Sequence, residues 1–133
     1  MKRAVLADTG PLYAAVDPDD QYYPRAQQEL TELQRRQLTV MLAYPTVSEA
    51  YTLVLYRLGR STARSWLQEI LKGATLINPA PEDYRMAVSK LEAYPDQSIT
   101  LFDAALAALS KRLSVPVWTY DHHFDVMRAA VWR

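Results

Sequence analysis

The sequence contains no cysteine and no long hydrophobic run. Without cysteine, the chain can form neither a disulfide framework nor a cysteine-based zinc site. Its first apolar run covers only residues 4–7, which is shorter than the apolar core of about 7–15 residues in a signal peptide. No stretch approaches the roughly 18 apolar residues that suggest a membrane-spanning helix. We therefore expect a soluble, cytoplasmic protein that does not associate with membranes.

The chain has no net charge at pH 7, because 15 Lys and Arg residues balance 15 Asp and Glu residues. The overall charge therefore gives no reason to expect a nucleic acid partner. Eleven of the basic residues are arginines, whose planar guanidinium group suits phosphate. If several carboxylates were held on a cation, the rest of the surface would be net positive.

The chain has 133 residues, half of them hydrophobic. This length and composition predict a single domain, residues 1–133, with a sizeable core. Short apolar runs alternate with helical patterns, which predicts an α/β fold with a mostly parallel sheet of about five strands. The expected strands are 4–7, 38–42, 75–77, 115–120 and 130–132. After a first helix that begins near Gly10 and Pro11, the expected helices are 23–36, 46–58, 61–72, 81–94 and 100–113.

Four acidic residues stand where sequences usually avoid them. Asp8 and Asp121 directly follow the first and fourth predicted strands, so both should project at the carboxyl edge of the sheet, where ligands bind in such folds. Glu49 and Asp103 lie near the starts of two helices. The helix of Asp103 is apolar almost all round, so it should be buried. A buried carboxylate needs a cation near it or takes up a proton.

Each acid also has a simpler interpretation. Asp8 and Asp121 could be turn residues after strands. Thr46 and Glu49 have the spacing of a helix capping box, and Thr100 and Asp103 form a close variant. Four acids at one edge, however, would repel one another unless a divalent cation were bound there. A site made only of oxygen ligands suits Mg²⁺, with Mn²⁺ as a second possibility.

The motifs around these acids resemble a known family, the PIN domain, and in particular the VapC-type toxins of bacterial toxin–antitoxin pairs. The resemblance covers nearly the whole chain. Its marks are Ala7-Asp8-Thr9-Gly10-Pro11-Leu12, Ser48-Glu49, Asp103-Ala104-Ala105 and Thr119-Tyr120-Asp121-His122-His123-Phe124.

The resemblance implies a PIN-like three-layer α/β/α fold and a Mg²⁺-dependent endoribonuclease that cleaves RNA with an activated water. The catalytic and metal-binding residues would be Asp8, Glu49, Asp103 and Asp121, with Asp8 and Asp103 as direct ligands. Thr9 and Thr119 would orient the carboxylates. The resemblance also implies a VapB-type antitoxin that inserts a segment into the site, and a homodimer.

Several alternatives stay open. The chain could be a catalytically inactive PIN-like module that binds RNA or protein. A receiver-like signalling domain would want adjacent acids after the first strand and a Lys after the last, and the sequence shows neither. Asp96 is expected to support the entry into a helix or to support a metal-binding residue rather than to bind metal itself, and Asp125 competes with Asp121 as the fourth acid.

Other polar and apolar groups have more than one interpretation. His122 and His123 are expected to point apart into solvent. Arg57, Arg60 and Arg64 could follow a phosphate backbone, bind an acidic partner or form a solvated face. Tyrosines near Tyr13, Tyr22 and Tyr23 could stack on bases. The dimer or antitoxin interface is expected on exposed apolar residues of two helices: Val54, Leu55, Leu58, Trp66 and Leu67.

Overall fold

The computed structural model describes residues 3–133 and has an α/β fold, as predicted. The strands are β1 (Ala4–Ala7), β2 (Thr39–Ala43), β3 (Thr75–Ile77) and β4 (Val117–Trp118). The helices are α1 (Thr9–Ala14), α2 (Tyr23–Arg35), α3 (Tyr44–Leu58), α4 (Arg60–Gly73), α5 (Pro81–Ala93), α6 (Leu101–Leu113) and α7 (His123–Val126). All strand pairs are parallel, in the order β3-β2-β1-β4.

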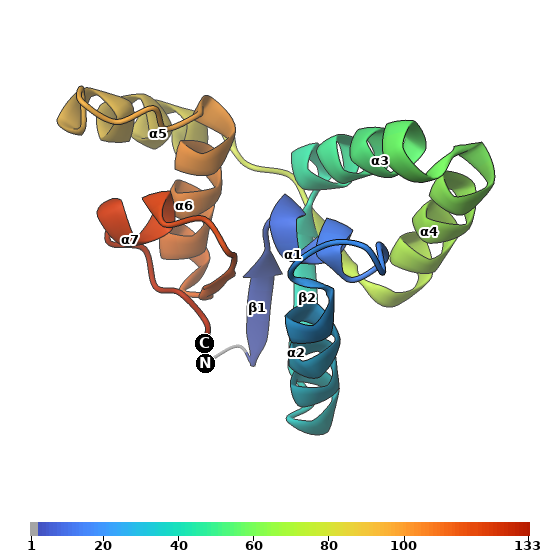
Figure 1. Ribbon diagram of the computed structural model, residues 1–133. Helices are drawn as coiled ribbons and strands as arrows, with labels where there is room; N and C mark the ends of the chain where they lie inside the picture. The colour runs from blue at the N-terminus through green and yellow to red at the C-terminus, as the bar shows by residue number, and fades with distance from the viewer. Residues whose placement is uncertain (1–2) are drawn as a thin grey trace.

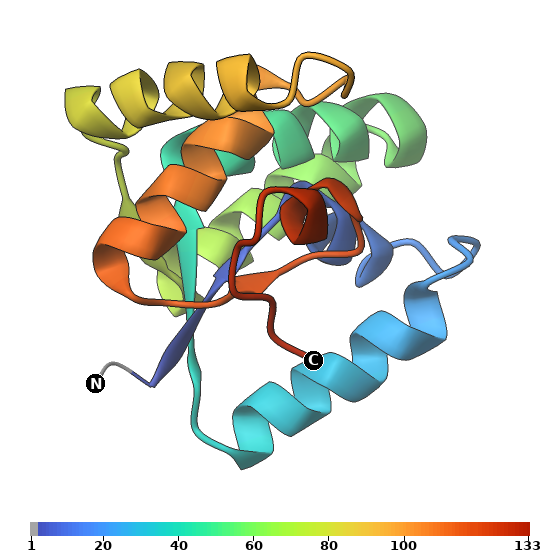
Figure 2. The same cartoon turned by 90° about the vertical axis from the view of Figure 1, so that its left-hand side faces the viewer.

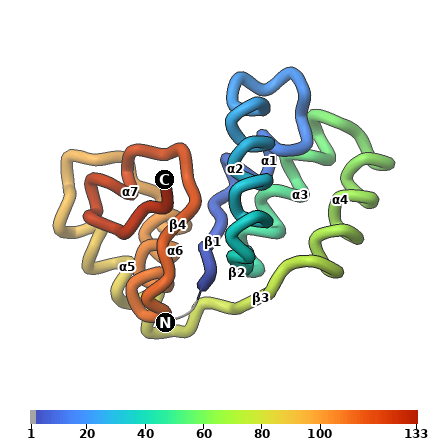
Figure 3. The backbone as a smooth tube through the Cα atoms, turned by 90° about the horizontal axis from the view of Figure 1, so that it is seen from below, coloured from blue at the N-terminus to red at the C-terminus, as the bar shows by residue number. Residues whose placement is uncertain are grey.

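The sheet is covered by helices on both faces, which confirms the predicted three layers (Figures 1 and 3). Because side chains alternate along a strand, β1 contributes to two cores. Leu6 packs in a core with residues of α5, α6 and α7, whereas Val5 and Ala7 face a core built with α1 to α4. All four residues of β1 are buried, so this strand forms the centre of the molecule.

The connection from β3 to β4 determines where a ligand site can form. The chain leaves the sheet at β3, passes through α5 and α6 across one face, and returns as β4 on the far side of β1 (Figure 2). The strand order therefore reverses between β1 and β4, and their carboxyl ends frame a crevice. The backbone N–H of Asp8 donates to the carbonyl of Trp118 at 2.9 Å, which joins the two strands at that crevice.

The end of the chain differs from the prediction. Segment 115–120 is a strand only at Val117–Trp118, and segment 130–132 makes a single parallel bridge between Val131 and Val117. Pro116 has no N–H to give to a ladder, and the chain leaves the sheet after Trp118. The fifth strand is therefore reduced to that bridge and two backbone hydrogen bonds.

Helix α3 begins at Tyr44, two residues earlier than predicted, with Pro45 in its first turn. Thr46 thus lies inside the helix rather than at its N-cap, and the capping interpretation of Thr46 and Glu49 is wrong. Gly59 ends α3 and starts α4 with φ +92°, a conformation that other residues rarely adopt.

The packing of α3 on α4 also corrects the predicted apolar interface. Val54 is fully buried and Trp66 is 7% exposed, both in the core on this side of the sheet. Leu55, Leu58 and Leu67 are partly buried against the same core. Val54 and Trp66 therefore stabilise the fold and are not the exposed residues that we expected, whereas an interface on the partly exposed Leu55, Leu58 and Leu67 stays a prediction. Within residues 3–133, no helix combines the length and apolarity that crossing a membrane requires.

Candidate active site

A pocket of about 410 Å³ lies at the carboxyl edge of the sheet and contains all four predicted acids. Its lining residues are Asp8, Thr9, Gly10, Glu49, Leu53, Thr100, Phe102, Asp103, Tyr120 and Asp121. The acids come from four different places in the chain: the ends of β1 and β4 and the first halves of α3 and α6. The fold thus brings together the residues that the sequence singled out.

Asp8 is the most constrained of the four. It is 6% exposed, and both of its carboxylate oxygens accept hydrogen bonds. Oδ1 accepts from the backbone N–H of Thr9 at 2.9 Å, and Oδ2 accepts from the hydroxyl of Thr119 at 2.8 Å. Asp8 is also the N-cap of α1. It is therefore both a turn residue after β1 and an acid of the pocket, so the two interpretations of Asp8 do not exclude each other. Each oxygen keeps a lone pair for a further ligand.

Asp121 is held by the same threonine. The hydroxyl oxygen of Thr119 accepts from the backbone N–H of Asp121 at 3.0 Å. The Asp121 carboxylate in turn accepts from the backbone N–H of His123 at 2.9 Å, which fixes the turn into α7. The two strand-end acids therefore share one buried hydroxyl group.

Asp103 lies in the first turn of α6. The side chain of Thr100 caps this helix by accepting from the backbone N–H of Asp103 at 3.1 Å. The capping prediction is thus correct for Thr100, while the carboxyl group of Asp103 lines the pocket and is 9% exposed as a residue. Glu49 lies on the exposed surface of α3 at the rim of the pocket.

The acids raise one another's proton affinity. Burial raises the pKa of Asp8 to about 6, and the charges of Asp121 and Glu49 add to this effect against the hydrogen bonds from Thr119 and Thr9. Burial, together with the charges of Asp8 and Asp121, raises the pKa of Asp103 to about 7. Within residues 3–133, no Lys or Arg lies within ion-pair distance of Asp8, Glu49, Asp103 or Asp121, so a cation in the pocket would lower the pKa values of these acids.

One further buried atom fits a cation and its hydration shell. The hydroxyl oxygen of Thr9, a residue of the pocket wall, is buried and has no hydrogen-bond partner among residues 3–133, although buried hydroxyls are nearly always paired. The donor set around it consists of carboxylate and hydroxyl oxygens, which suit a hard divalent ion. The residues present therefore fit a metal of the Mg²⁺ type.

The two acids left open by the sequence lie outside the pocket. Asp125 forms a two-pronged pair with Arg133, at 3.0 and 2.8 Å. Asp96 is exposed in the loop before α6, and Thr100 rather than Asp96 caps that helix. The expectation that Asp96 supports the helix entry is therefore wrong, whereas its support of a metal-binding residue stays a prediction. Geometry favours Asp121 over Asp125 as the fourth acid of the pocket.

The histidines do not point apart. The rings of His122 and His123 lie 4.4 Å apart, and their Nδ1 atoms are 3.8 and 3.2 Å from the same oxygen of Asp121. Only His122 is largely exposed, with 76% of its side chain in solvent against 18% for His123. The turn into α7 brings both rings to one carboxylate, an effect of local backbone geometry that residue order does not reveal.

Tyr120 is a pocket residue that the sequence analysis did not single out. Its hydroxyl donates to Glu29 of α2, whose Oε1 also accepts from the indole N–H of Trp118 at 3.2 Å. The Arg25 guanidinium lies 4.4 Å from the centre of the Tyr120 ring. These contacts fasten the end of β4, next to Thr119 and Asp121, to α2. In the sequence, the only indication that Tyr120 belongs to the pocket is its position between Thr119 and Asp121.

The three arginines that the sequence singled out, Arg57, Arg60 and Arg64, do not line the pocket of the four acids. Arg57 stands over the ring of Tyr13 at 5.0 Å, and Tyr13 is only 4% exposed, so it cannot stack on a base. Arg60 and Arg64 line an open, polar pocket at the junction of α3 and α4. They remain compatible with a phosphate backbone, an acidic partner or solvent.

Solved structures with the same architecture include the VapC20 toxin and two further proteins, VapBC2 and FitAcB. The VapC20 toxin of Mycobacterium tuberculosis, a sarcin–ricin loop cleaving toxin, superposes with a TM-score of 0.83 at 17% identity, covering 98% of this chain and 99% of that one. VapBC2 of Rickettsia felis, bound to a fragment of its promoter DNA, gives 0.75 at 15%, with 98% and 97% covered. FitAcB of Neisseria gonorrhoeae gives 0.69 at 22%, with 97% and 96% covered.

Sequence comparison gives the family independently of these superpositions. Among curated proteins, none matches the sequence significantly. The family model of the PIN domain, by contrast, matches residues 5–130, a span that includes the strand-end acids and both helical ones. With the α/β architecture and the four acids in one pocket, this match shows that the chain belongs to the PIN domain family.

Proposed function

We propose that the protein is a divalent-metal-dependent endoribonuclease and the toxin of a VapBC-type pair, acting in the cytoplasm. The observation that carries the proposal is the convergence of four carboxylates from four chain segments in one pocket at the β1–β4 crevice. The family match and the toxin neighbours support it.

The residues of the pocket have different roles in this proposal. Asp8 and Asp103, the most buried of the four pocket acids, would hold the cation directly, and Glu49 and Asp121 would complete its surroundings. A bound Mg²⁺ or Mn²⁺ supplies Lewis acidity toward a phosphate oxygen and makes water a stronger acid. Thr119 and the N–H of Thr9 hold the Asp8 carboxylate in place. Either Glu49 or Asp121 would orient the attacking water, whose oxygen displaces the 3′ oxygen and leaves a 5′-phosphate.

Partners follow from the same proposal. The structural neighbours include VapBC2 and a toxin–antitoxin complex from Klebsiella pneumoniae, which supports a VapB-type antitoxin for this chain. A homodimer in solution is part of the same proposal. An antitoxin segment that places a cationic side chain in the pocket would neutralise Asp8 and Asp103.

The test is cleavage of single-stranded and looped RNA by purified protein, with Mg²⁺, with Mn²⁺ and with excess chelator. We expect cleavage only with metal, 5′-phosphate ends, and loss of activity in Asp8→Asn. The matched control is Asp125→Asn, because Asp125 is also acidic and near the end of the chain but pairs with Arg133 outside the pocket. Full activity in chelator would refute the metal mechanism.

Growth during induced expression separates the nuclease from an inactive binding module. We expect wild type to slow growth and Asp8→Asn to relieve this at equal protein levels. If both variants slow growth equally, or neither does, a PIN-like module that only binds RNA or protein is the better interpretation.

A further inference from the structure

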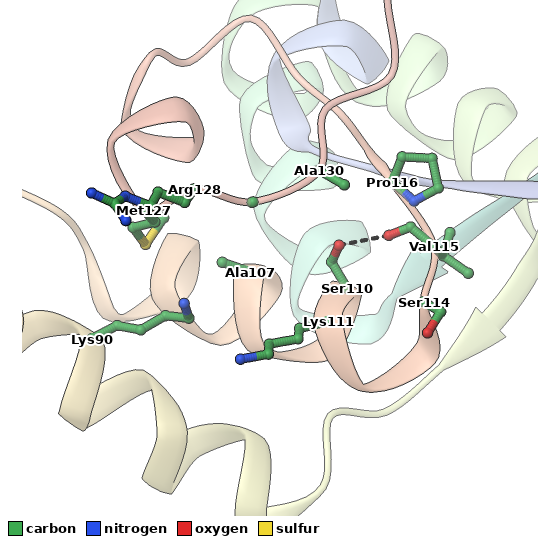
Figure 4. Close-up of a pocket in the computed structure, with 11 residues that line it drawn as sticks. Lys90, Ala107, Ser110, Lys111, Ser114, Val115, Pro116, Met127, Arg128 and Ala130 are labelled. Atoms are coloured by element: carbon green, nitrogen blue, oxygen red, sulfur yellow. Dashed lines mark hydrogen bonds between the residues drawn. The ribbon is translucent and has the colours of Figure 1, made fainter.

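A second pocket, of about 600 Å³, lies at the other end of α6 from the carboxylates (Figure 4). Its walls come from α5, the last turns of α6, the segment before β4 and the chain that follows α7. Asp103 is in the first turn of α6, whereas Ser110 and Lys111 are near its end. The two pockets share no lining residue, so this one is a separate feature of the surface.

The floor of this pocket is apolar. Ala107, Val115 and Met127 line it and are each at least 97% buried as residues. The hydroxyl of Ser110 donates to the carbonyl of Val115 at 2.6 Å, as the dashed line in Figure 4 shows, so it offers no free donor proton to a ligand. An apolar side chain of a partner would gain free energy by entering here.

The rim, in contrast, is cationic. Lys90, Lys111 and Arg128 line the pocket, and no Asp or Glu does. Within residues 3–133, none of the three is within ion-pair distance of a carboxylate. Figure 4 shows the amines of Lys90, from α5, and Lys111, from α6, on the same side of the pocket. Burial and the charge of Lys111 both lower the pKa of Lys90, so these like charges are uncompensated.

We propose that this pocket binds a segment of a partner protein in which an apolar side chain is flanked by carboxylates. The apolar side chain would cover Val115 and Met127, and the carboxylates would pair with Lys90, Lys111 and Arg128. RNA fits less well, because no aromatic side chain lines the pocket for a base to stack on. The inference does not depend on the proposed nuclease activity, since no residue of that site takes part.

The experiment measures the fluorescence anisotropy of a labelled synthetic peptide of alternating leucine and glutamate, titrated with the full chain in chelator. We expect saturable binding that the double variant Lys90→Glu/Lys111→Glu weakens roughly tenfold or more, because two pairs are lost and repulsion replaces them. The control Lys72→Glu/Arg85→Glu makes the same change of charge at exposed residues outside the pocket and should bind like wild type. Lys90→Gln/Lys111→Gln replaces the first variant if charge reversal disturbs folding.

Two further probes decide what the pocket recognises. Replacing leucine by glycine in the peptide should weaken binding as much as replacing glutamate by glutamine. Equal binding of the glycine peptide would reduce the pocket to a nonspecific cationic surface and overturn the proposal. Tighter binding of oligouridylate that is lost in the Lys90→Glu/Lys111→Glu variant would assign the pocket to nucleic acid instead. Absence of peptide binding to wild type would also overturn it.

Discussion

Thr119 and Asp8 are 111 residues apart in the sequence, and the hydroxyl of Thr119 donates a hydrogen bond of 2.8 Å to Oδ2 of Asp8. The hydroxyl oxygen of Thr119 also accepts a hydrogen bond from the backbone N–H of Asp121. Thr119 is 5% exposed, so this contact is closed to bulk water. One threonine therefore joins the carboxyl ends of β1 and β4 and fixes the relative position of two acids.

Thr119→Val tests this role, since valine keeps the shape of threonine and removes both hydrogen bonds. It leaves Oδ2 of Asp8 buried without a donor, and we expect a loss of about 1–3 kcal/mol in the free energy of unfolding. Cleavage should fall by about tenfold or more, because the carboxylates are no longer positioned. Thr119→Ser retains the hydroxyl and is the matched control. Urea unfolding and cleavage rates measure both effects, and equal behaviour of the two variants would remove Thr119 from the site.

Stability of the metal-free protein should fall as the pH rises from about 4 to about 7. The pKa values of Asp8 and Asp103 are raised to about 6 and about 7 in the folded state, so the folded chain binds more protons than the unfolded chain in this range. Each proton released on raising the pH therefore disfavours the folded state. Saturating Mg²⁺ and the variant Asp8→Asn should each make the free energy of unfolding depend less on pH in this range. Urea midpoints against pH give the measurement, and a metal-free midpoint that rises over this range would contradict the raised pKa values.

The opposite pH dependence is expected from Asp83. Arg112 donates two hydrogen bonds of 2.9 Å to its carboxylate, and the Arg112 side chain holds the pKa of Asp83 below its ordinary value of 3.8. This pair between α5 and α6 should stabilise the protein above about pH 4, and that contribution should be lost as the pH falls through the lowered pKa.

Arg112→Met should therefore cost about 1–3 kcal/mol at neutral pH, because it leaves the Asp83 carboxylate unpaired and 2% exposed. The control Arg35→Met breaks an exposed pair with Glu32 and should change stability by less than about 1 kcal/mol. Thermal unfolding measures both variants. A change in Mg²⁺-dependent stabilisation in Arg112→Met would show that the pair supports the pocket as well.

The placement of Asp8 and Asp121 could be predicted from the sequence because parallel strands present their carboxyl ends at one edge. The position of Asp103 in the pocket could be predicted because a buried carboxylate in an apolar helix needs a cation near it or takes up a proton. The predicted start of α3 at Thr46 is two residues late because the capping pattern of Thr46 and Glu49 suggests an N-cap there, whereas Pro45 lies in the first turn, a position that proline favours. The capping pattern is short, and it occurs by chance inside helices as well as at their ends.

Contacts between residues far apart in the chain could not be predicted. Glu29 meets Trp118 and Tyr120 about 90 positions later, and no local pattern indicates such a pair. The burial of Val54 and Trp66 depends on how α3 packs against α4. The amphipathic patterns of the two helices show an apolar face, but they do not show whether the partner is another helix or another protein.

The final prediction separates the two roles of Asp103, in the first turn of α6 and in the pocket. If Asp103 only supported its helix, Asp103→Asn would cost about 0.5–2 kcal/mol with or without metal. Thr100 already caps α6, and burial and the charges of Asp8 and Asp121 oppose ionisation of Asp103. We therefore expect the metal-free variant to be at least as stable as metal-free wild type at neutral pH.

Mg²⁺ should raise the melting temperature of wild type, because a ligand that binds only the folded state stabilises it in proportion to RT ln(1 + [L]/Kd). Asp103→Asn should lose most of this rise, since one oxygen ligand and one negative charge are gone. Asp96→Asn is the control: Asp96 is exposed and does not line the pocket, so the full rise should remain. The measurement is a melting curve for each of the three proteins with and without Mg²⁺. An equal Mg²⁺ response in all three, with Asp103→Asn less stable throughout, would make Asp103 a structural residue of α6 and leave three acids in the pocket to hold the cation.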